Sequence, residues 1–259
     1  MSKSERNEII FAFIITIIMT IMDISGLPAI MFINIKILDI QPFYFSLMAN
    51  FLLTAIVFFV GWKTLYSKWD FGLGTRGLLS GIKKFGLSGL IIFLFSTLAF
   101  VVGLMPFDNK PTVVKVVIEG FIYYIGVAFI EELYIRGLIL NIIEKLFYKK
   151  QNATLYAIVT SSVIFGVGHI FGTLGSSLLT IVCKVLWTIG LGLYLGVVYK
   201  KTNNLWVSII LHVVIDFCAF PFCFSSTPPY PEVSLWILLL VYVLVCCYSF
   251  YIFRKSDIL

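Results

Sequence analysis

Charged residues are scarce in this chain, since Asp, Glu, Lys and Arg make up only 12% of its 259 residues, while hydrophobic residues make up 60%. A typical soluble domain carries about 25% charged residues. No polar stretch is long enough to form a separate soluble domain, and there is no internal repeat. The composition therefore predicts an all-α fold, a polytopic transmembrane helix bundle that covers residues 1–259 as a single domain.

Several familiar motifs are also missing. None of the five cysteines shows C-x-x-C spacing, so we expect neither a disulfide framework nor a zinc knuckle. The net charge is +6, but the basic residues fall between apolar runs rather than along a stripe. We therefore expect membrane lipids as partners and no nucleic acid.

Eight apolar runs follow one another along the chain and predict about eight membrane spans. The fourth run has about 35 residues and would be ~50 Å long as a helix, which is more than a bilayer needs. In the sixth run, Gly192 and Gly196 form a small-x-x-x-small face for close helix packing. The runs lie at about 9–38, 43–62, 85–105, 112–147, 153–171, 176–199, 205–220 and 233–253.

The basic residues orient these spans. With a cytoplasmic amino terminus, fourteen of the 19 Lys and Arg residues fall on the inner side. By the positive-inside rule, both termini are expected in the cytoplasm of a multi-pass membrane protein. The abundance of Ile, Lys, Asn and Phe is typical of a low-GC bacterium, so we expect the bacterial plasma membrane.

Two carboxylates and a guanidinium interrupt the fourth run, at Glu131, Glu132 and Arg136. Each ionisable group inside an apolar span costs about 2.5–3.5 kcal/mol on insertion scales, so its presence indicates function. Glu132 and Arg136 are four residues apart and share a helix face, whereas Glu131 is turned about 100° away. We therefore predict a Glu132–Arg136 ion pair and a separate role for Glu131.

The chain has only two histidines, and both lie in apolar runs. His169 ends the fifth run, and His212 lies in the seventh with Asp216 one helical turn later. A carboxylate one turn from an imidazole can accept its N–H and hold the other nitrogen toward a substrate. If the three helices converge, their polar groups form one pocket, and residues 112–220 form the catalytic core.

The residue types in this pocket favour hydrolysis by activated water. There is no Gly-x-Ser-x-Gly motif, so we do not expect covalent catalysis. Glu131 can act as a general base on water, while His169 and His212 polarise a carbonyl, stabilise an oxyanion or protonate a leaving amine. Together these roles describe a peptide or amide hydrolase that works in the membrane.

Two other interpretations use the same residues. Glu plus two His is a known catalytic zinc set, but His-Glu-x-x-His spacing is absent, so we expect no cofactor and keep zinc as an alternative. An ion- or proton-coupled transporter would also bury acids and histidines, but we find no inverted repeat.

The pattern Glu131-Glu132-x-x-x-Arg136, Phe165-x-x-x-His169 and His212-x-x-x-Asp216 resembles the CPBP family of CAAX proteases and bacteriocin-processing enzymes, also called Abi. Its eukaryotic members are the type II CAAX prenyl endopeptidases. The resemblance implies an all-helical intramembrane endopeptidase in which Glu131 activates water, supported by Glu132 and Arg136. His169 and His212 match the family histidines.

The resemblance leaves open the role of Asp216, the identity of the substrate and whether the protein is catalytic. Asp216 matches a position that is Asn or Asp in the family, and because an ionised Asp cannot donate to an oxyanion, Asp216 is either protonated or orients His212. A metal-free, glutamate-based mechanism fits these residues. The implied substrate is a membrane-associated peptide or protein of unknown identity. Bacterial members also act in self-immunity, so the alternative is a non-catalytic bacteriocin-immunity or membrane scaffold protein.

The predicted depths do not agree with one another. Counted along the spans, His212 lies about seven residues, or ~10 Å, from the inner face, whereas Glu131 and His169 lie near or beyond the middle. Either the helices are offset and tilted, or a predicted span boundary is wrong.

Overall fold

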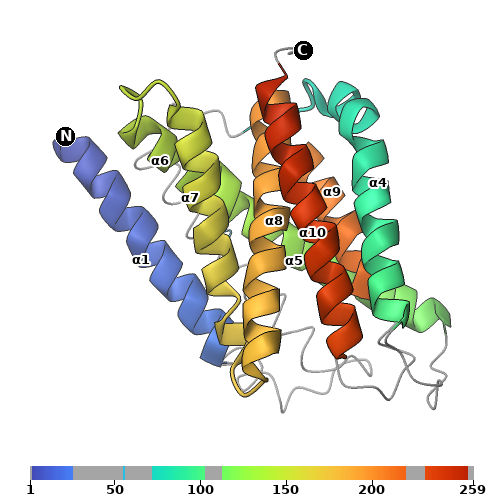
Figure 1. Ribbon diagram of the computed structural model, residues 1–259. Helices are drawn as coiled ribbons and strands as arrows, with labels where there is room; N and C mark the ends of the chain where they lie inside the picture. Colours follow the sequence, from blue (N-terminus) through green and yellow to red (C-terminus); the bar gives the residue numbers. More distant parts are fainter. Residues whose placement is uncertain (1, 26–54, 56–71, 103–112, 220–230, 256–259) are drawn as a thin grey trace.

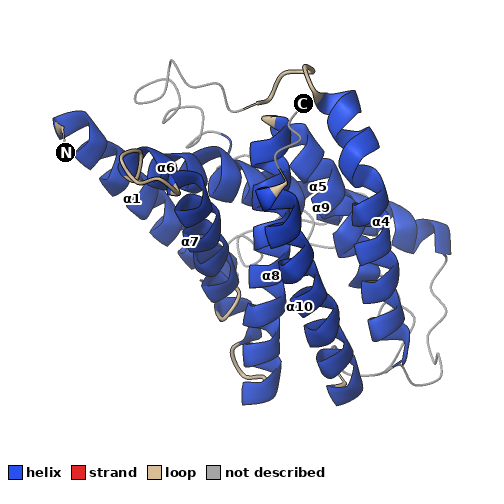
Figure 2. Cartoon of the chain, turned by 45° about the horizontal axis from the view of Figure 1, so that its top comes forward, coloured by secondary structure: helices blue, strands red, loops and turns tan. Residues whose placement is uncertain are grey.

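The computed structural model describes residues 2–25, 55, 72–102, 113–219 and 231–255. Every regular element in this part of the chain is helical, as Figure 2 shows, which agrees with the predicted all-α fold. The elements are α1 (Lys3–Ser25), α4 (Leu78–Val102), α5 (Val113–Glu132), the π-helix η1 (Leu133–Leu140), α6 (Asn141–Leu146), α7 (Ala153–Gly168), the 3₁₀ turn η2 (Phe171–Thr173), α8 (Leu178–Thr202), α9 (Leu205–Asp216) and α10 (Glu232–Arg254).

Four of the described helical segments are long and apolar enough to cross a membrane. They are Leu78–Val102, Ala153–Thr173, Leu178–Thr202 and Glu232–Arg254, and they match the third, fifth, sixth and eighth predicted runs. The predicted second run, 43–62, lies almost entirely outside the described residues. The several apolar helices indicate a multi-pass membrane protein.

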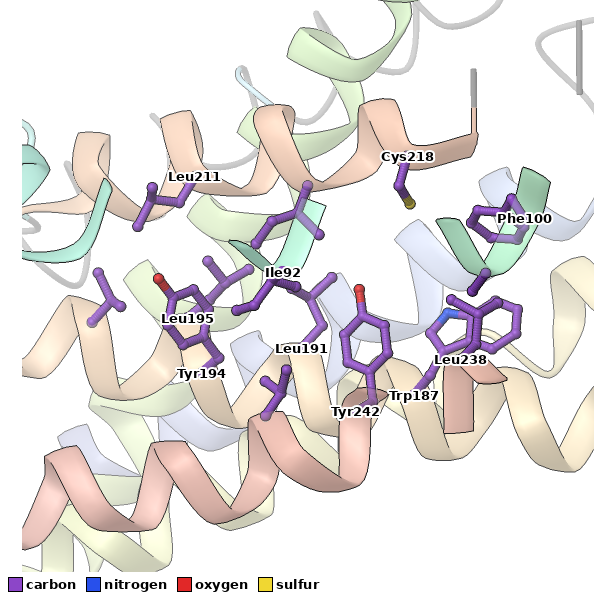
Figure 3. Close-up of a cluster of buried hydrophobic side chains, with 14 of the residues drawn as sticks. Ile92, Phe100, Trp187, Leu191, Tyr194, Leu195, Leu211, Cys218, Leu238 and Tyr242 are labelled. Atoms are coloured by element: carbon purple, nitrogen blue, oxygen red, sulfur yellow. The ribbon is translucent and has the colours of Figure 1, made fainter. Parts of the chain in front are cut away.

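Helix α8 is the central element of the bundle. Two thirds of its most apolar window is buried inside the protein, against one third in each of the other three candidate spans. Figure 1 shows α8 beside α7 and α10, with α4 beyond α10. Trp187, Leu191 and Tyr194 of α8 belong to the main hydrophobic cluster, which Figure 3 shows together with Tyr242 of α10 and Ile92 of α4.

Two glycines allow α8 to approach α7 closely. A Cβ atom at Gly192 would lie 2.9 Å from the Cβ of Ser162, and one at Gly196 would lie 3.1 Å from the Cγ2 of Ile158. Both contacts are tighter than ordinary van der Waals packing, so a larger residue would push the helices apart. The predicted packing face of Gly192 and Gly196 is thus confirmed.

The outer faces of α4 and α10 expose large apolar side chains, among them Leu87, Phe95, Leu240 and Leu244. A soluble monomer rarely exposes a contiguous apolar surface of this kind. The exposed faces are those that a lipid bilayer would cover.

The start of α9 is fixed by a glycine-rich segment that precedes α4. The backbone N–H of Leu205 donates to the Gly72 carbonyl at 2.9 Å, and the side-chain amide of Asn204 donates to the carbonyls of Gly74 and Arg76 at 2.8 and 2.9 Å. Gly72 has a φ of +71° and its Cα lies against the Asn203 carbonyl, so only glycine suits this position.

The α-helix α9 covers Leu205–Asp216 and continues as a 3₁₀ turn, so the helical segment Leu205–Ala219 agrees with the predicted run 205–220. The twelve residues of α9 are about 18 Å long, less than the ~30 Å of a hydrocarbon core. The Asn204 side chain caps its first turn by accepting from the N–H of Val207, and the α-helix ends at Asp216. The comparison of site depths along the predicted spans assumed that the seventh run crosses the whole membrane, but α9 is too short to do so.

Candidate active site

The structure brings all six predicted site residues together from three helical segments. Glu131 and Glu132 end α5, Arg136 lies in η1, and His169 follows the last residue of α7. His212 and Asp216 lie one turn apart on α9. The fourth, fifth and seventh predicted runs therefore converge as expected.

The Glu132–Arg136 ion pair forms the buried base of the site, as predicted. The Nη1 atom of Arg136 lies 2.8 Å from Oε1 of Glu132, and both side chains are fully buried. Nη2 of Arg136 donates to the Gly192 carbonyl at 3.3 Å, and the guanidinium lies 4.8 Å above the ring of Phe165. Arg136 therefore connects its own helix to α7 and α8.

The backbone around Arg136 is π-helical from Leu133 to Leu140. A π-turn contains one residue more than an α-turn and occurs frequently at functional sites. Sequence periodicity predicted an ordinary helix here, because the apolar run is continuous on both sides of the polar residues. The π-helix is a feature that the sequence analysis missed.

His212 is held by Glu132. Its Nδ1 atom lies 2.8 Å from Oε1 of Glu132, the same carboxylate that Arg136 contacts. Because the ion pair makes this carboxylate an acceptor, Nδ1–H is the donor and Nε2 faces the other way. Asp216, which from its spacing could also accept an imidazole N–H, lies on the other side of the ring, with Oδ2 3.5 Å from Nε2.

His169 is held by backbone. Its Nδ1 atom lies 2.9 Å from the carbonyl oxygen of Phe165, which can only accept, so Nδ1 carries the proton. The Phe165 ring packs edge-on against both imidazoles, with centroid distances of 4.7 Å to His169 and 6.0 Å to His212. Phe165 and His169 share a helix face, as their spacing predicted.

Glu131 lies between the two histidines. Its Oε1 is 3.9 Å from Nε2 of His169, and its Oε2 is 3.5 Å from Nε2 of His212. These distances are longer than an ordinary N–H···O hydrogen bond, so Glu131 is near both imidazoles without a short bond to either Nε2 atom. The structure therefore turns both Nε2 atoms toward one carboxylate.

The six side chains form an accessible layer and a buried layer. Glu131, His169 and Asp216 are each 22 to 23% exposed, whereas Glu132, Arg136 and His212 are at most 1% exposed. The exposed carboxyl and imidazole groups can meet a substrate. The buried groups fix the direction of the His212 ring.

The same geometry can be considered for a metal. Within the described ranges, no group of three or more His, Cys, Asp or Glu side chains has the arrangement of a metal site. A chelator experiment tests the zinc interpretation.

Asn141 is a polar residue of this region that the sequence analysis did not select. Its side-chain amide donates to the backbone carbonyls of Arg136 and Gly137 at 3.1 and 2.9 Å. An isolated Asn five residues after Arg136 in an apolar run was the available signal.

Comparison with known proteins supports a family assignment. The family model described as type II CAAX prenyl endopeptidase Rce1-like matches residues 113–218, a range that contains all six site residues. No curated protein matches the chain. The family is one of intramembrane proteases, and the resemblance found in the motifs is confirmed. Residues 113–218 of this chain are thus a domain of the Rce1-like type II CAAX prenyl endopeptidase family within the CPBP group.

Proposed function

We propose that the protein is an intramembrane endopeptidase that hydrolyses a peptide bond of a membrane-associated peptide or protein, with Glu131 as the base that activates water. The observation that carries this proposal is the position of Glu131, whose two carboxylate oxygens face the Nε2 atoms of His169 and His212 at 3.9 and 3.5 Å. A water or a substrate carbonyl placed between these groups would contact a base and two imidazoles at once.

In the proposed reaction, Glu131 takes one proton from water as the water oxygen attacks the scissile carbonyl carbon. The C–O bond forms and the carbonyl oxygen becomes an oxyanion. Glu131 then gives the proton to the leaving amide nitrogen, and the C–N bond breaks. The products are a new carboxylate and a new amine, and no covalent enzyme intermediate forms.

His212 is the proposed oxyanion donor. Protonated on both nitrogens, it donates Nδ1–H to Glu132 and directs Nε2–H toward Glu131 and Asp216, each 3.5 Å away. His169 has its Nδ1–H on the Phe165 carbonyl, so its Nε2 exchanges protons with the water or the leaving group. Asp216 is proposed to complete the accessible side of the site.

We also propose that residues 112–220 are the catalytic core of a single transmembrane domain that covers residues 1–259. The family implies a peptide or protein substrate, and the exposed apolar faces of α4 and α10 support its delivery from the lipid phase.

We also propose eight spans, with both termini in the cytoplasm and the protein in a bacterial plasma membrane. Figure 1 supports a common side for the termini, because the beginning of α1 and the end of α10 lie at the same end of the bundle. The α6–α7 and α8–α9 turns lie at that end too. The first carries Lys149 and Lys150, and the last turn of α8 carries Lys200 and Lys201. Clustered Lys and Arg are typical of the cytoplasmic side.

The activity is tested with purified protein in liposomes and a library of quenched, membrane-tethered peptides, with and without chelator. We expect cleavage that persists in chelator and is lost in His169→Ala. Cleavage that chelator abolishes and zinc restores would support the metal alternative. An absence of cleavage, together with protection of cells by the Glu131→Gln variant, would support the immunity alternative.

A further inference from the structure

The side chain of Asn141 lies where the π-helix η1 returns to the α-helix α6. Its Nδ2 group donates to the carbonyls of Arg136 and Gly137 at 3.1 and 2.9 Å, and it contacts the hydroxyl of Tyr199 on α8 at 2.9 Å. Asn141 therefore contacts the backbone of the residue whose side chain holds Glu132.

These carbonyl contacts have a local cause. The backbone N–H of Asn141 donates to the Leu138 carbonyl, three residues back, and not to the carbonyl of Arg136. Where a π-helix changes to an α-helix, the hydrogen-bond register changes, and carbonyls at the change need another donor. In an apolar surrounding an unpaired carbonyl is costly, and the side-chain amide of Asn141 supplies the missing donor.

A second set of contacts fixes which way the Asn141 amide points. Nζ of Lys200 donates to Oδ1 of Asn141 at 2.9 Å, and an ammonium can only donate, so the oxygen must face Lys200 and the nitrogen the carbonyls. Lys200 also pairs with Glu144, which accepts a hydrogen bond from Thr154 of α7 at 2.6 Å. The network thus joins α6, α7 and α8 beneath the π-helix.

We propose that Asn141 is a positioning residue of the site, which holds the π-helical backbone in the register that places Arg136 against Glu132 and, through Glu132, sets the direction of the His212 imidazole. Asn141 touches none of the six site side chains that the mechanism uses, so it acts through Arg136. Its effect on catalysis rests on the proposed peptidase function, whereas its effect on the His212 ring does not.

The critical variant is Asn141→Asp, which keeps the size of the side chain and an oxygen for Lys200 but replaces the donor by an oxygen that faces two carbonyls. We expect kcat to fall by about 10–100-fold, the range for outer-shell partners of catalytic groups, with KM changed less than about twofold. Ser249→Ala is the control, because Ser249 is also buried and donates to a backbone carbonyl, that of Val245, but lies on α10, which carries none of the six site residues.

A spectroscopic measurement separates positioning from stability. The chain has only two histidines, so ¹⁵N-histidine labelling gives two imidazole spin systems. In the wild type, the His212 Nδ1–H bonded to the Glu132 carboxylate gives a distinct proton signal. We expect this signal to shift or disappear in Asn141→Asp and to remain in Ser249→Ala, even when both variants melt at similar temperatures.

The outcomes are distinguishable. A His212 signal and a kcat that are unchanged in folded Asn141→Asp would overturn the proposal. If no substrate is cleaved even by the wild type, the proposed function fails, and the NMR signal alone decides the positioning role. If Asn141→Asp does not fold, Asn141→Ser is measured, since its hydroxyl can keep the bond to the Gly137 carbonyl, four residues back, but loses the one to Arg136. A His212 signal in Asn141→Ser that moves from its wild-type position or disappears supports the proposal, and an unchanged one overturns it.

Discussion

Arg136 and Glu132 are charged side chains with no exposure to solvent, and each has its main ionic partner in the other. Removing one member of such a pair leaves an uncompensated buried charge, which costs about 3–5 kcal/mol, whereas removing both costs much less. The pair therefore has a thermodynamic signature that differs from that of two independent polar contacts.

Arg136→Met should lower the free energy of unfolding by about 3–5 kcal/mol, because Glu132 then remains buried with the His212 imidazole as its one ionic partner in the described part of the chain. Glu132→Gln should have a similar effect through the unpaired guanidinium. The double variant should be more stable than either single variant. Thermal or denaturant unfolding in detergent measures all three, and simple additivity of the two single effects would argue against a coupled pair.

Asp216 allows a second prediction, because its Oδ2 lies 3.5 Å from the same Nε2 of His212 that faces Glu131. If Asp216 serves as a hydrogen-bond donor beside the oxyanion, Asn can replace it. We expect Asp216→Asn to keep at least about a tenth of kcat and Asp216→Leu to lose about 10²–10³-fold, as with an oxyanion donor. An Asp216→Asn variant as inactive as Asp216→Leu would show that a carboxylate is required.

For single residues, the sequence indicated which side chains belong to the site better than it indicated which side chains they contact. Ionisable groups are rare in apolar runs, so Glu131, Arg136 and His212 could be selected from the sequence alone. The acceptor of the His212 Nδ1–H could not, because Glu132 and His212 are 80 residues apart and meet only through helix packing. Local spacing indicated Asp216, one turn away, as a possible partner of His212, whereas helix packing places Glu132 at Nδ1 and Asp216 near Nε2.

The elements that carry the site depend on close packing between α7 and α8. Ser162 of α7 faces Gly192 of α8, whose carbonyl accepts the hydrogen bond from Arg136. A shift of α8 at this point would therefore move an anchor of the buried ion pair.

Gly192→Ala should destabilise the protein by about 1–3 kcal/mol, because the new Cβ lies 2.9 Å from the Cβ of Ser162. Adding Ser162→Gly should recover part of this loss. The control is Gly86→Ala in α4, where the new Cβ would lie 3.7 Å from Cγ2 of Ile82, an ordinary contact, and alanine favours the helix. Melting temperatures give the comparison, and equal effects at Gly192 and Gly86 would contradict the packing account.

Whole helices could be predicted better than their irregularities. The runs at 85–105, 176–199 and 233–253 correspond to α4, α8 and α10, because long apolar runs specify long helices. The π-helix and the short α9 could not be read in the same way. The first is supported by the side chain of Asn141, and the second is set by the cap at Asn204 and by its end at Asp216, all of which depend on tertiary contacts.

The whole molecule places its basic turns at one end. The α6–α7 and α8–α9 turns, the beginning of α1 and the end of α10 lie there in Figure 1, and α7 and α8 meet at the opposite end. The distribution of Lys and Arg along the sequence predicts that this end faces the cytoplasm.

Reporter fusions test the proposed topology directly. A reporter that is active only in the cytoplasm should be active at either terminus and inactive when inserted at Gly175, in the turn between α7 and α8. A periplasmic reporter at the same positions should give the reverse pattern and serves as the control. Opposite locations for the two termini would contradict the eight-span topology.

The central claim is that Glu131 activates the water that cleaves the peptide bond, and the most direct measurement is kcat for one cleaved, membrane-tethered peptide in liposomes. Glu131→Gln keeps the size of the side chain but cannot take a proton, so kcat should fall by about 10²–10⁴-fold, the usual contribution of a general base. Glu5→Gln, at a half-buried carboxylate near the amino terminus that accepts from the Ser2 N–H at 2.6 Å, should leave kcat unchanged. A folded Glu131→Gln variant that cleaves the peptide at the wild-type rate would contradict the account.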